Sequence, residues 1–309
     1  MTELSSTLPD RTTPFDVMIV GGGPAGLSAA LVLGRACRRV LLLDGGTYRN
    51  DPTRRVHGFL TRDGATPRAL RAVARAQLAP YDVTCVDAKV TQIARRGTRF
   101  RARLADGHTV RARRVLLATG MRDHVPDFPG FQAIDGRSAH HCPYCDAWEW
   151  RGRSVAVYAS TKGVDYALAL TAWTSDVVLI THGRRAPRGD GAARLRRHGV
   201  RVETRPVTRL VSRRGALDAI ELESGDPLAR DALFFHLGME QASELPGHLG
   251  CAFEGSGFVR VDASCRTSVT GVYAAGDLTP GPQSVVWAAA EGARAAAALH
   301  QDLRRSETR

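Results

Sequence analysis

The feature that most constrains the fold is a glycine-rich loop between an apolar strand and a helix. Residues 15–20 (FDVMIV) are typical of a buried parallel strand, and the loop GGGPAG follows at once. The glycines have GxGxxG spacing, which permits a tight turn, close approach of a pyrophosphate to the backbone, and close packing of helix on strand. The loop residues are Gly21, Gly22, Gly23, Pro24, Ala25 and Gly26. This pattern predicts an α/β fold that binds a nucleotide.

An acidic residue stands where such a loop requires one. The second apolar run, residues 39–43, ends at Asp44, which Gly45 follows. Asp44 lies 18 residues beyond Gly26, and a carboxylate at this distance can accept hydrogen bonds from the ribose hydroxyls of an adenosine. The phosphates would then lie at the helix N-terminus, where unpaired backbone N–H groups and the helix dipole favour negative charge.

A CPYC motif in the middle of the chain indicates redox chemistry. Cys142 and Cys145 are three residues apart, and Asp146 follows directly. Cysteines in such loops have lowered thiol pKa values, so they can close and reopen a disulfide. A zinc half-site is the alternative, but no second CxxC and no His pair lies at ligand spacing, so we predict no metal site. A glutaredoxin-like domain would carry the motif near its start, whereas here it lies deep in a chain of 309 residues.

The composition argues against several functional classes. A hydrophobic content of 43% with 24% charged residues is ordinary for a globular protein, and 309 residues suit two domains. The apolar runs are too short to cross a bilayer, and the N-terminus lacks the apolar core of a secretion signal. We therefore expect a cytoplasmic protein without a membrane span, with free thiols at the cysteines outside the CPYC motif. The net charge is +12, but the basic residues are mostly scattered arginines, so we expect no nucleic-acid partner.

Two more motifs complete an ordered set of four. LLATG ends at Gly120, and TSVTGVYAAGD ends at Asp277. Together with GGGPAGLSAA and CPYCD, in this order and at these distances, they resemble the low-molecular-weight thioredoxin reductase family, from about residue 15 to residue 300. The resemblance implies two doubly wound Rossmann-like domains, the second inserted into the first. It implies an FAD-binding domain over residues 1–121 and 239–309, and a second domain with the CxxC motif over residues 122–238.

The same resemblance implies how FAD is held. Asp277 lies on the ribityl chain, and Gln283 and Ser284 contact the flavin at the start of the last helix. Asn50 and His57 follow the second strand, in the loop where the family holds its cofactor, although His57 fits an ordinary surface histidine equally well. The other implied contacts come from the two short turns that end the added motifs, Ala118, Thr119, Gly120 and Gly276. A homodimer is implied as well.

The middle third lacks the glycines of a second nucleotide site. After the apolar strand at 154–158, the three positions where the family needs small residues carry Ala159, Thr161 and Val164. A Cβ at each position crowds the turn and holds a pyrophosphate away from the backbone. The Arg184–Arg185 pair follows the next strand, where a 2′-phosphate clamp is expected, but arginine pairs are frequent in this chain. We expect no strong NADPH binding.

The missing glycines suggest a direction of electron flow. Without a nicotinamide donor, a small dithiol substrate would reduce the Cys142–Cys145 pair, and dioxygen would accept the electrons through FAD. This resembles the thioredoxin reductase-like dithiol oxidases that form disulfides in small natural products such as gliotoxin and holomycin. One alternative is reduction of a thioredoxin-like protein with NADPH or ferredoxin as the donor. Another is a flavin-bound redox sensor that does not turn over.

Roles around the dithiol follow from the resemblance. Cys145 is implied to face the flavin and Cys142 to form the mixed disulfide with substrate. Asp146 is the expected base, as in the reductases, whereas the dithiol oxidases often place a histidine there. His140 or His141 could supply that imidazole. Adjacent residues on an extended segment point to opposite sides, so we expect at most one of the two to face the thiols.

Overall fold

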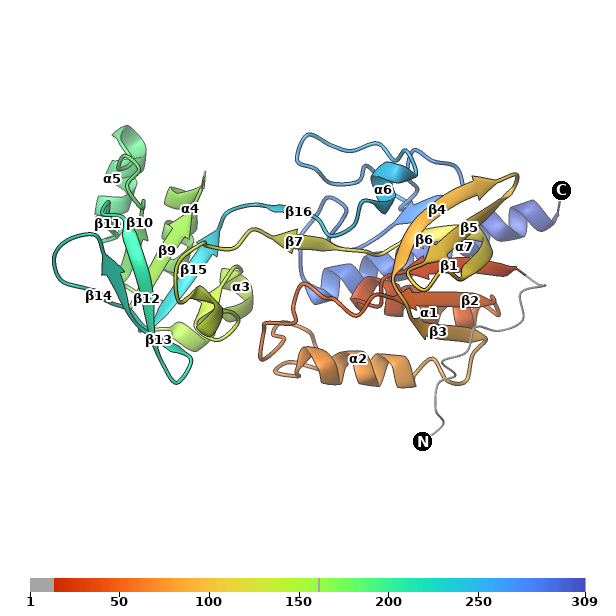
Figure 1. Cartoon of the computed structure of the whole chain (residues 1–309), viewed down its shortest axis with the longest axis horizontal. Helices are drawn as coiled ribbons and strands as arrows, with labels where there is room; N and C mark the ends of the chain where they lie inside the picture. Colours follow the sequence, from red (N-terminus) through yellow and green to blue (C-terminus); the bar gives the residue numbers. More distant parts are fainter. Residues whose placement is uncertain (1–13, 161, 309) are drawn as a thin grey trace. The chain divides into compact units, whose positions relative to one another are not determined.

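The computed structural model describes residues 14–160 and 162–308, which form two compact units. Unit 1 comprises Met1–Arg49, Pro67–Arg122 and Glu240–Arg309, and unit 2 comprises Asn50–Thr66 and Asp123–Met239. Each unit contains a sheet with parallel strands and helical connections (Figure 1). The α/β class predicted from the sequence, with two Rossmann-like sheets, is therefore confirmed.

Unit 1 is built on a seven-stranded sheet whose central strands are apolar because both faces are covered. In spatial order the strands are β3 (Val83–Asp87), β2 (Val40–Asp44), β1 (Phe15–Val20), β6 (Thr109–Leu117), β5 (Arg99–Leu104) and β4 (Val90–Arg96), and β17 (Val272–Ala274) pairs with the end of β6. Strand β5 pairs antiparallel with both β4 and β6, and the other strand pairs are parallel. The parallel strands therefore bring their carboxyl ends, with the loops that follow them, to one edge of the sheet.

Helix α1 (Pro24–Arg35) follows the glycine loop and packs closely on α7 (Val285–Glu307). A Cβ at Gly292 would lie 2.0 Å from the carbonyl oxygen of Ala25, so this crossing requires a glycine. Pro24 suits the first turn of α1 because its missing N–H is not needed there. The remaining helices of unit 1 are α2 (Pro67–Ala76) and α6 (Leu245–His248).

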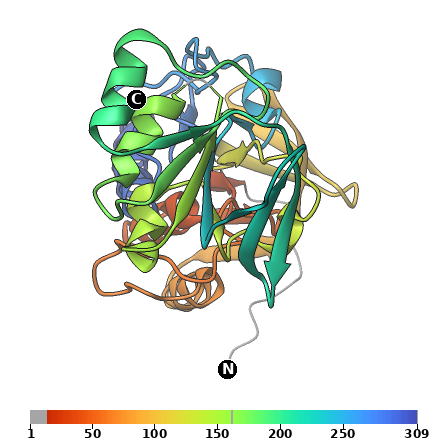
Figure 2. The ribbon, with the colours of Figure 1, turned by 90° about the vertical axis from the view of Figure 1, so that its left-hand side faces the viewer.

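Unit 2 has a five-stranded sheet in which all strands are parallel. Their order is β11 (Arg201–Glu203), β10 (Val177–Ile180), β9 (Val155–Ala159), β15 (Ala232–His236) and β8 (Ala139–His140). The helical segments are η1 (Phe131–Ala133), α3 (Pro143–Asp146), η2 (Ala147–Trp150), α4 (Gly163–Leu170) and α5 (Gly189–Arg197). An antiparallel sheet of β12 (Val207–Arg213), β13 (Ala216–Leu222) and β14 (Leu228–Ala229) completes the unit, which faces the viewer in Figure 2.

Two segments of the chain leave unit 1 for unit 2 and return, residues 50–66 and residues 123–239. One passage runs through β7 (Met121–Asp123) and β16 (Met239–Gln241), which pair with each other. The other is the segment Asn50–Thr66, which the sequence assigned to the FAD-binding domain and which the structure places in unit 2. The reason is a close packing contact: a Cβ at Gly136 would lie 1.9 Å from the carbonyl oxygen of Pro52. Which cofactor each unit binds stays a prediction.

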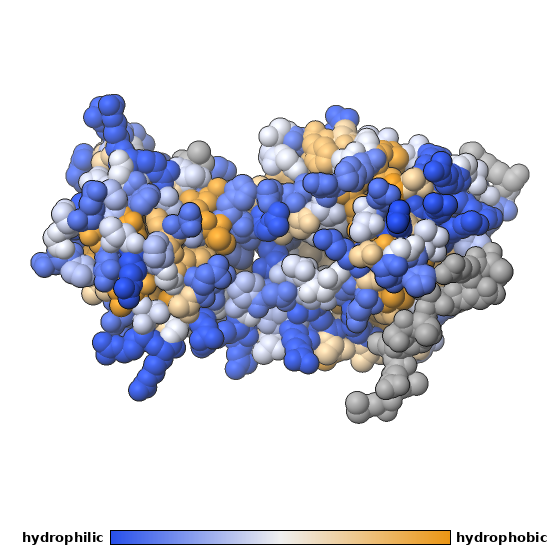
Figure 3. Space-filling model, viewed as in Figure 1, coloured by the Kyte–Doolittle hydropathy of each residue, from blue (hydrophilic) through white to orange (hydrophobic). Residues whose placement is uncertain are grey.

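Polar and charged side chains cover much of the face shown in Figure 3, with smaller apolar areas between them. Among the described residues, no helix is both long enough and apolar enough to cross a membrane.

Candidate functional site

The glycine loop of unit 1 has the geometry that its spacing predicts. Gly21 has a φ of 114°, and a Cβ there would lie 2.2 Å from the carbonyl oxygen of Ala118. A Cβ at Gly26 would lie 1.9 Å from the carbonyl oxygen of Gly21. Around Gly23, in contrast, no described atom lies within 4 Å of such a Cβ. Two glycines therefore serve packing, and the third borders open space, as the approach of a pyrophosphate requires.

Asp44, the expected ribose acceptor, is bound by donors from the protein itself. It ends β2 and is 3% exposed. Its Oδ2 accepts hydrogen bonds from the Tyr48 hydroxyl and from the Arg75 guanidinium, and its Oδ1 accepts one from the backbone N–H of Gly46 at 3.1 Å. A Cβ at Gly22 would lie 1.9 Å from Oδ2. The carboxylate thus lies against the glycine loop, and a ribose hydroxyl would have to share it with Tyr48 and Arg75.

Thr119 provides a second sign of a ligand near the loop. Its Oγ1 is buried and has no hydrogen-bond partner in the described part of the chain. Thr119 directly follows Ala118, whose carbonyl oxygen lies against Gly21. A buried hydroxyl without a partner is costly, and a ligand or water ordinarily satisfies it. The open space at Gly23 and this hydroxyl fit a dinucleotide such as FAD.

The turn at Gly276 and Asp277 is held by a buried glutamate. Glu291 of α7 is 4% exposed, and its Oε2 accepts from the backbone N–H of Gly276 at 2.9 Å and from the Thr279 hydroxyl at 2.7 Å. Gly276 has a φ of 90° and approaches α1 closely. The sequence analysis did not single out Glu291; its one signal is a carboxylate inside an alanine-rich helix.

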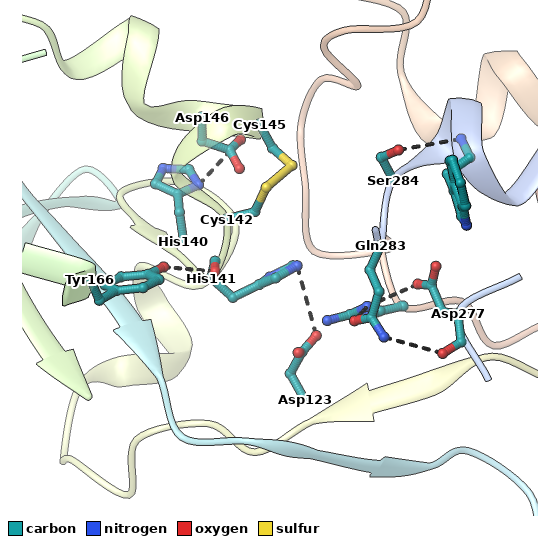
Figure 4. Close-up of a disulfide and its surroundings, with 12 residues drawn as sticks. Asp123, His140, His141, Cys142, Cys145, Asp146, Tyr166, Asp277, Gln283 and Ser284 are labelled. Atoms are coloured by element: carbon teal, nitrogen blue, oxygen red, sulfur yellow. Dashed lines mark hydrogen bonds and ion pairs between the residues drawn. A yellow bond between two sulfur atoms is a disulfide. The ribbon is translucent and has the colours of Figure 1, made fainter. Parts of the chain in front are cut away.

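Arg49 links two of the expected flavin contacts. Its Nη1 donates to Oδ2 of Asp277 at 2.9 Å and to Oε1 of Gln283 at 2.6 Å. The Nε2 of Gln283 donates to the carbonyl oxygen of Asp277 at 3.2 Å (Figure 4). Ser284 serves as the N-cap of α7, because its Oγ accepts from the backbone N–H of Trp287 at 3.3 Å. The structure thus brings Asp277 and Gln283 together around an arginine that the sequence analysis missed.

In unit 2 the CPYC cysteines form a disulfide, as predicted for a redox pair. Cys142 is the N-cap of α3, and its carbonyl oxygen accepts from the backbone N–H groups of Cys145 and Asp146, each at 3.2 Å. Pro143 begins this single turn. The other cysteines are not disulfide-bonded in the structure; they are Cys37, Cys85, Cys251 and Cys265. No group of three or more His, Cys, Asp or Glu among the described residues could hold a metal ion.

Near the disulfide, burial shifts the pKa values of Asp146 and His140 in opposite directions. Burial, reinforced by Glu149, raises the pKa of Asp146 to about 7, and His57 opposes this rise. Burial, reinforced by His141, lowers the pKa of His140 to about 4. Near neutral pH the imidazole is therefore uncharged, and the carboxyl group is the one that can exchange a proton.

The tautomer of His140 follows from its neighbour Trp150. The indole Nε1–H of Trp150 donates to Nε2 of His140 at 3.1 Å, and an indole nitrogen can only donate. The proton of the neutral imidazole must then lie on Nδ1, which is 3.4 Å from Oδ1 of Asp146 (Figure 4). This N–H lies near the Asp146 carboxylate, and the backbone of Arg137 also bonds the imidazole.

His141 turns to a different carboxylate. Its Nε2 lies 3.8 Å from Oδ2 of Asp123, and its backbone carbonyl oxygen accepts from the Tyr166 hydroxyl at 2.7 Å (Figure 4). The two adjacent imidazoles therefore have separate partners, Asp146 for His140 and Asp123 for His141. The sequence could have suggested the alternation but not the partners.

The predicted contacts of Asn50 and His57 with FAD stay predictions. Both residues belong to unit 2. His57 lies between two carboxylates, with Nε2 3.6 Å from Oε1 of Glu149 and Nδ1 3.5 Å from Oδ2 of Asp63. Asn50 begins a turn in which its carbonyl oxygen accepts from the backbone N–H of Thr53 at 3.2 Å. After Arg49 the chain leaves unit 1.

The loop after β9 also differs from a nucleotide site. Ala159 is 5% exposed, and Val164 packs against the core of unit 2. Thr161 lies outside the described residues. Arg184, a candidate phosphate clamp, directs its guanidinium at backbone carbonyl groups of this loop.

Comparison with known proteins supports the interpretation of the glycine loop and of the CxxC disulfide. Residues 15–292 match the family model for pyridine nucleotide-disulphide oxidoreductases. The thioredoxin reductase tcpT of Claviceps purpurea is 33% identical over 85% of this chain and 86% of its own length. Among solved structures, HlmI is 37% identical with a TM-score of 0.91, covering 96% of this chain and 94% of that one. An oxidoreductase from Agrobacterium tumefaciens is 33% identical with a TM-score of 0.88, covering 95% of this chain and 99% of that one.

Proposed function

The chain belongs to the pyridine nucleotide-disulphide oxidoreductase family, as a flavin disulfide oxidoreductase of thioredoxin reductase type with a CxxC disulfide, and from this premise we propose that it is a dithiol oxidase. In this proposal a small dithiol, of the kind found in natural products, is oxidised to its disulfide. Dioxygen is the final electron acceptor and becomes peroxide. A homodimer and a cytoplasmic location remain predictions.

The observation that carries the proposal is the loop after β9. In unit 1, Gly21 and Gly26 stand where any Cβ would overlap the backbone, whereas unit 2 has Ala159 and Val164 at the matching positions. The position matching Gly23, whose open side a pyrophosphate approaches, carries Thr161 in the sequence, and a side chain there would hold the pyrophosphate away from the backbone. A nicotinamide donor is thereby disfavoured, while the CxxC disulfide can still receive electrons from a dithiol.

The loop after β9 presents carbonyl groups, which Arg184 binds. Its guanidinium donates to the carbonyl oxygens of Ala159 at 2.9 Å, Ser160 at 3.3 Å and Thr181 at 3.0 Å. The backbone N–H of Ser160 donates to the carbonyl oxygen of His236 at 3.0 Å. A phosphate-binding loop presents free N–H groups, but this one presents carbonyl groups to a cation. That arrangement supports the loss of a dinucleotide site.

The proposed chemistry consists of two thiol–disulfide exchanges. A substrate thiolate attacks Sγ of Cys142, the Cys142–Cys145 bond breaks, and Cys145 leaves as a thiolate. The second substrate thiolate then attacks the substrate sulfur of the mixed disulfide, which releases Cys142 and the substrate disulfide. The substrate loses two electrons and two protons, and the cysteine pair gains the two electrons. When bound in unit 1, FAD supplies the relay that takes these electrons on to dioxygen.

Asp146 is suited to move the protons. With a pKa of about 7 it can accept a proton from a substrate thiol and release it again near neutral pH. His140 stays neutral and orients the carboxylate through its Nδ1–H. In unit 1, the residues proposed to hold FAD are the loop Gly21–Gly26, Asp44, Thr119, Asp277 and Gln283.

A second candidate is reduction of a thioredoxin-like protein, with NADPH or ferredoxin as the electron donor. The name of the Claviceps purpurea relative, a thioredoxin reductase, favours it. The same cysteines would then carry electrons in the opposite direction.

Anaerobic spectroscopy separates the two candidates. FAD-loaded protein is mixed without oxygen either with a small dithiol or with NADPH, and the flavin colour is followed. The oxidase proposal expects bleaching by the dithiol, little bleaching by NADPH, and recovery on admitting oxygen with one peroxide formed per substrate disulfide. Cys145→Ser should remove bleaching by the dithiol and leave FAD bound.

Other outcomes would point elsewhere. Rapid, saturable bleaching by NADPH would identify a reductase. Bleaching by the dithiol without recovery in oxygen would indicate a sensor. Full dithiol oxidation by Cys145→Ser would exclude the CxxC mechanism.

A further inference from the structure

We propose that Arg49 is a positioning residue of the FAD site, which holds Asp277 and Gln283 in the orientation that receives the cofactor. The inference rests on the FAD site proposed for unit 1 and extends it to a residue from the opposite end of the chain. Arg49 is the last residue of unit 1 before the chain enters unit 2, whereas its two partners come from the last third of the sequence.

The first support is the burial of the bridge. The side chains of Arg49 and Asp277 are 13% and 21% exposed, so this ion pair is largely shielded from solvent. One nitrogen of Arg49, Nη1, donates both to Asp277 and to Gln283. Charge-assisted hydrogen bonds in a shielded place are stronger than ion pairs at an open surface. The bridge is therefore able to fix both side chains.

The second support is the direction that Arg49 imposes on Gln283. An arginine can only donate, so the Gln283 amide must present Oε1 to it. The Nε2 end then faces the carbonyl oxygen of Asp277, to which it donates. The carbonyl oxygen of Asp277 can only accept, so both contacts require the same orientation of the amide. Arg49 thus reinforces the orientation of Gln283 and ties it to the Asp277 carboxylate.

The third support is the position left for the cofactor. Arg49 binds Oδ2 of Asp277, which leaves Oδ1 as an acceptor for a hydroxyl group of the ribityl chain. The backbone of the same loop is fixed separately, because Glu291 binds Gly276 and Thr279, and Ser284 caps α7. Glu291 therefore sets the path of the loop, and Arg49 sets the two side chains that it carries.

The alternative is that Arg49 occupies the place of the cofactor and must move away before FAD binds. The two possibilities predict opposite effects of removing the guanidinium. A positioning arginine raises the affinity for FAD, whereas an arginine that competes with the cofactor lowers it.

The test measures FAD affinity by titrating apoprotein with FAD and following the quenching of flavin fluorescence. Arg49→Met keeps most of the side chain's length without its donors and should weaken FAD binding about tenfold or more. Arg49→Lys keeps the charge but not the planar fork and should fall between Arg49→Met and the unmodified protein. Arg35→Met is the matched control, because Arg35 binds the Tyr81 hydroxyl at the surface of unit 1, and it should bind FAD normally.

Unchanged or tighter FAD binding by Arg49→Met would overturn the proposal. If Arg49→Met does not fold, as judged by circular dichroism of the apoprotein, the Arg49→Lys titration decides alone, and normal affinity there would equally overturn it. The proposed oxidase activity is tested separately. If all variants bind FAD as expected and no dithiol is oxidised, the oxidase proposal fails and the role of Arg49 stands.

Discussion

The loops after β1 and after β9 open similar strand–helix units, and they differ in their glycines and in the groups that contact their backbone. In unit 1 two glycines let the strand, loop and helix approach within distances that no Cβ allows, and Gly23 borders open space. In unit 2 the loop carries Ala159, and the guanidinium of Arg184 lies on its carbonyl groups. Both loops follow a buried strand that pairs parallel with its neighbours. If unit 2 binds no dinucleotide, as proposed, its apolar strands preserve the fold after the loop has lost the chemistry of a nucleotide site.

The largest effect is expected where unit 1 is made to resemble unit 2. In Gly26→Ala the added Cβ would lie 1.9 Å from the carbonyl oxygen of Gly21, so strand and helix must separate. We expect a loss of about 3 kcal/mol or more in the free energy of unfolding, together with loss of bound FAD. Denaturant unfolding of the apoprotein and flavin content after gel filtration would measure both.

Gly23→Ala is the control for this experiment, because its Cβ meets no described atom within 4 Å. It should unfold like the unmodified protein but bind FAD less tightly, since the methyl group would enter the pyrophosphate space. If Gly26→Ala were as stable as the unmodified protein and kept its flavin, the contrast between the two loops would lose its physical basis.

An intermediate effect on activity is expected from Asp146, the residue of unit 2 proposed to move protons beside the disulfide. Asp146→Asn should lower the rate of dithiol oxidation about 100-fold, because the amide cannot accept a proton. In the unmodified protein the rate should rise with pH through about 7, as the carboxyl group ionises. A pH–rate profile would show whether this limb disappears in the variant. An unchanged profile would remove Asp146 from the mechanism.

The same carboxyl group makes a prediction for stability. Burial raises its pKa from 3.8 to about 7, so between these values the folded protein holds a proton that the unfolded chain releases. Stability therefore falls as pH rises through this window. Asp146→Asn should lose less stability than the unmodified protein between pH of about 4 and about 8. Unfolding in urea at both pH values would test it, and equal losses in both proteins would contradict the raised pKa.

The smallest effect is expected where unit 2 is made to resemble unit 1. A triple variant, Ala159→Gly with Thr161→Gly and Val164→Ala, should gain slow flavin bleaching by NADPH. Adding Arg184→Met should increase this rate further, because the guanidinium no longer occupies the carbonyl groups of the loop. Arg185→Met in the triple variant is the control. If Arg184→Met alone abolished an existing reaction with NADPH, Arg184 would be a phosphate clamp and the comparison would fail.

Local patterns were sufficient to predict much of unit 1. The run FDVMIV lies in a buried strand, and the glycines of the loop occupy tight or open positions as their spacing indicates. The CPYC cysteines form a disulfide, as expected for a pair at the start of a helical turn. These features belong to short motifs whose spacing is visible in the sequence, even where, as for Gly21 and Ala118, the contact itself is distant.

The remaining features depend on partners far away in the chain. Arg49 binds residues more than 200 positions later, and no local pattern marks it. The placement of the segment 50–66 in unit 2, where Pro52 contacts Gly136, has no local signal either. The tautomer of His140 likewise depends on the indole of Trp150. Such pairings are set by tertiary packing, which periodicity and spacing do not encode.

The crossing of α1 and α7 has a consequence for biosynthesis. Helix α1 leaves the ribosome long before α7, whose Gly292 lies against Ala25. The apolar side of the nascent α1 has no partner until the residues between the two helices and α7 itself have been made. During that interval it is an exposed hydrophobic surface, of the kind that chaperones recognise and that drives aggregation when translation stops early. Truncation within α7 should therefore harm the yield of soluble protein more than its distance from the disulfide suggests.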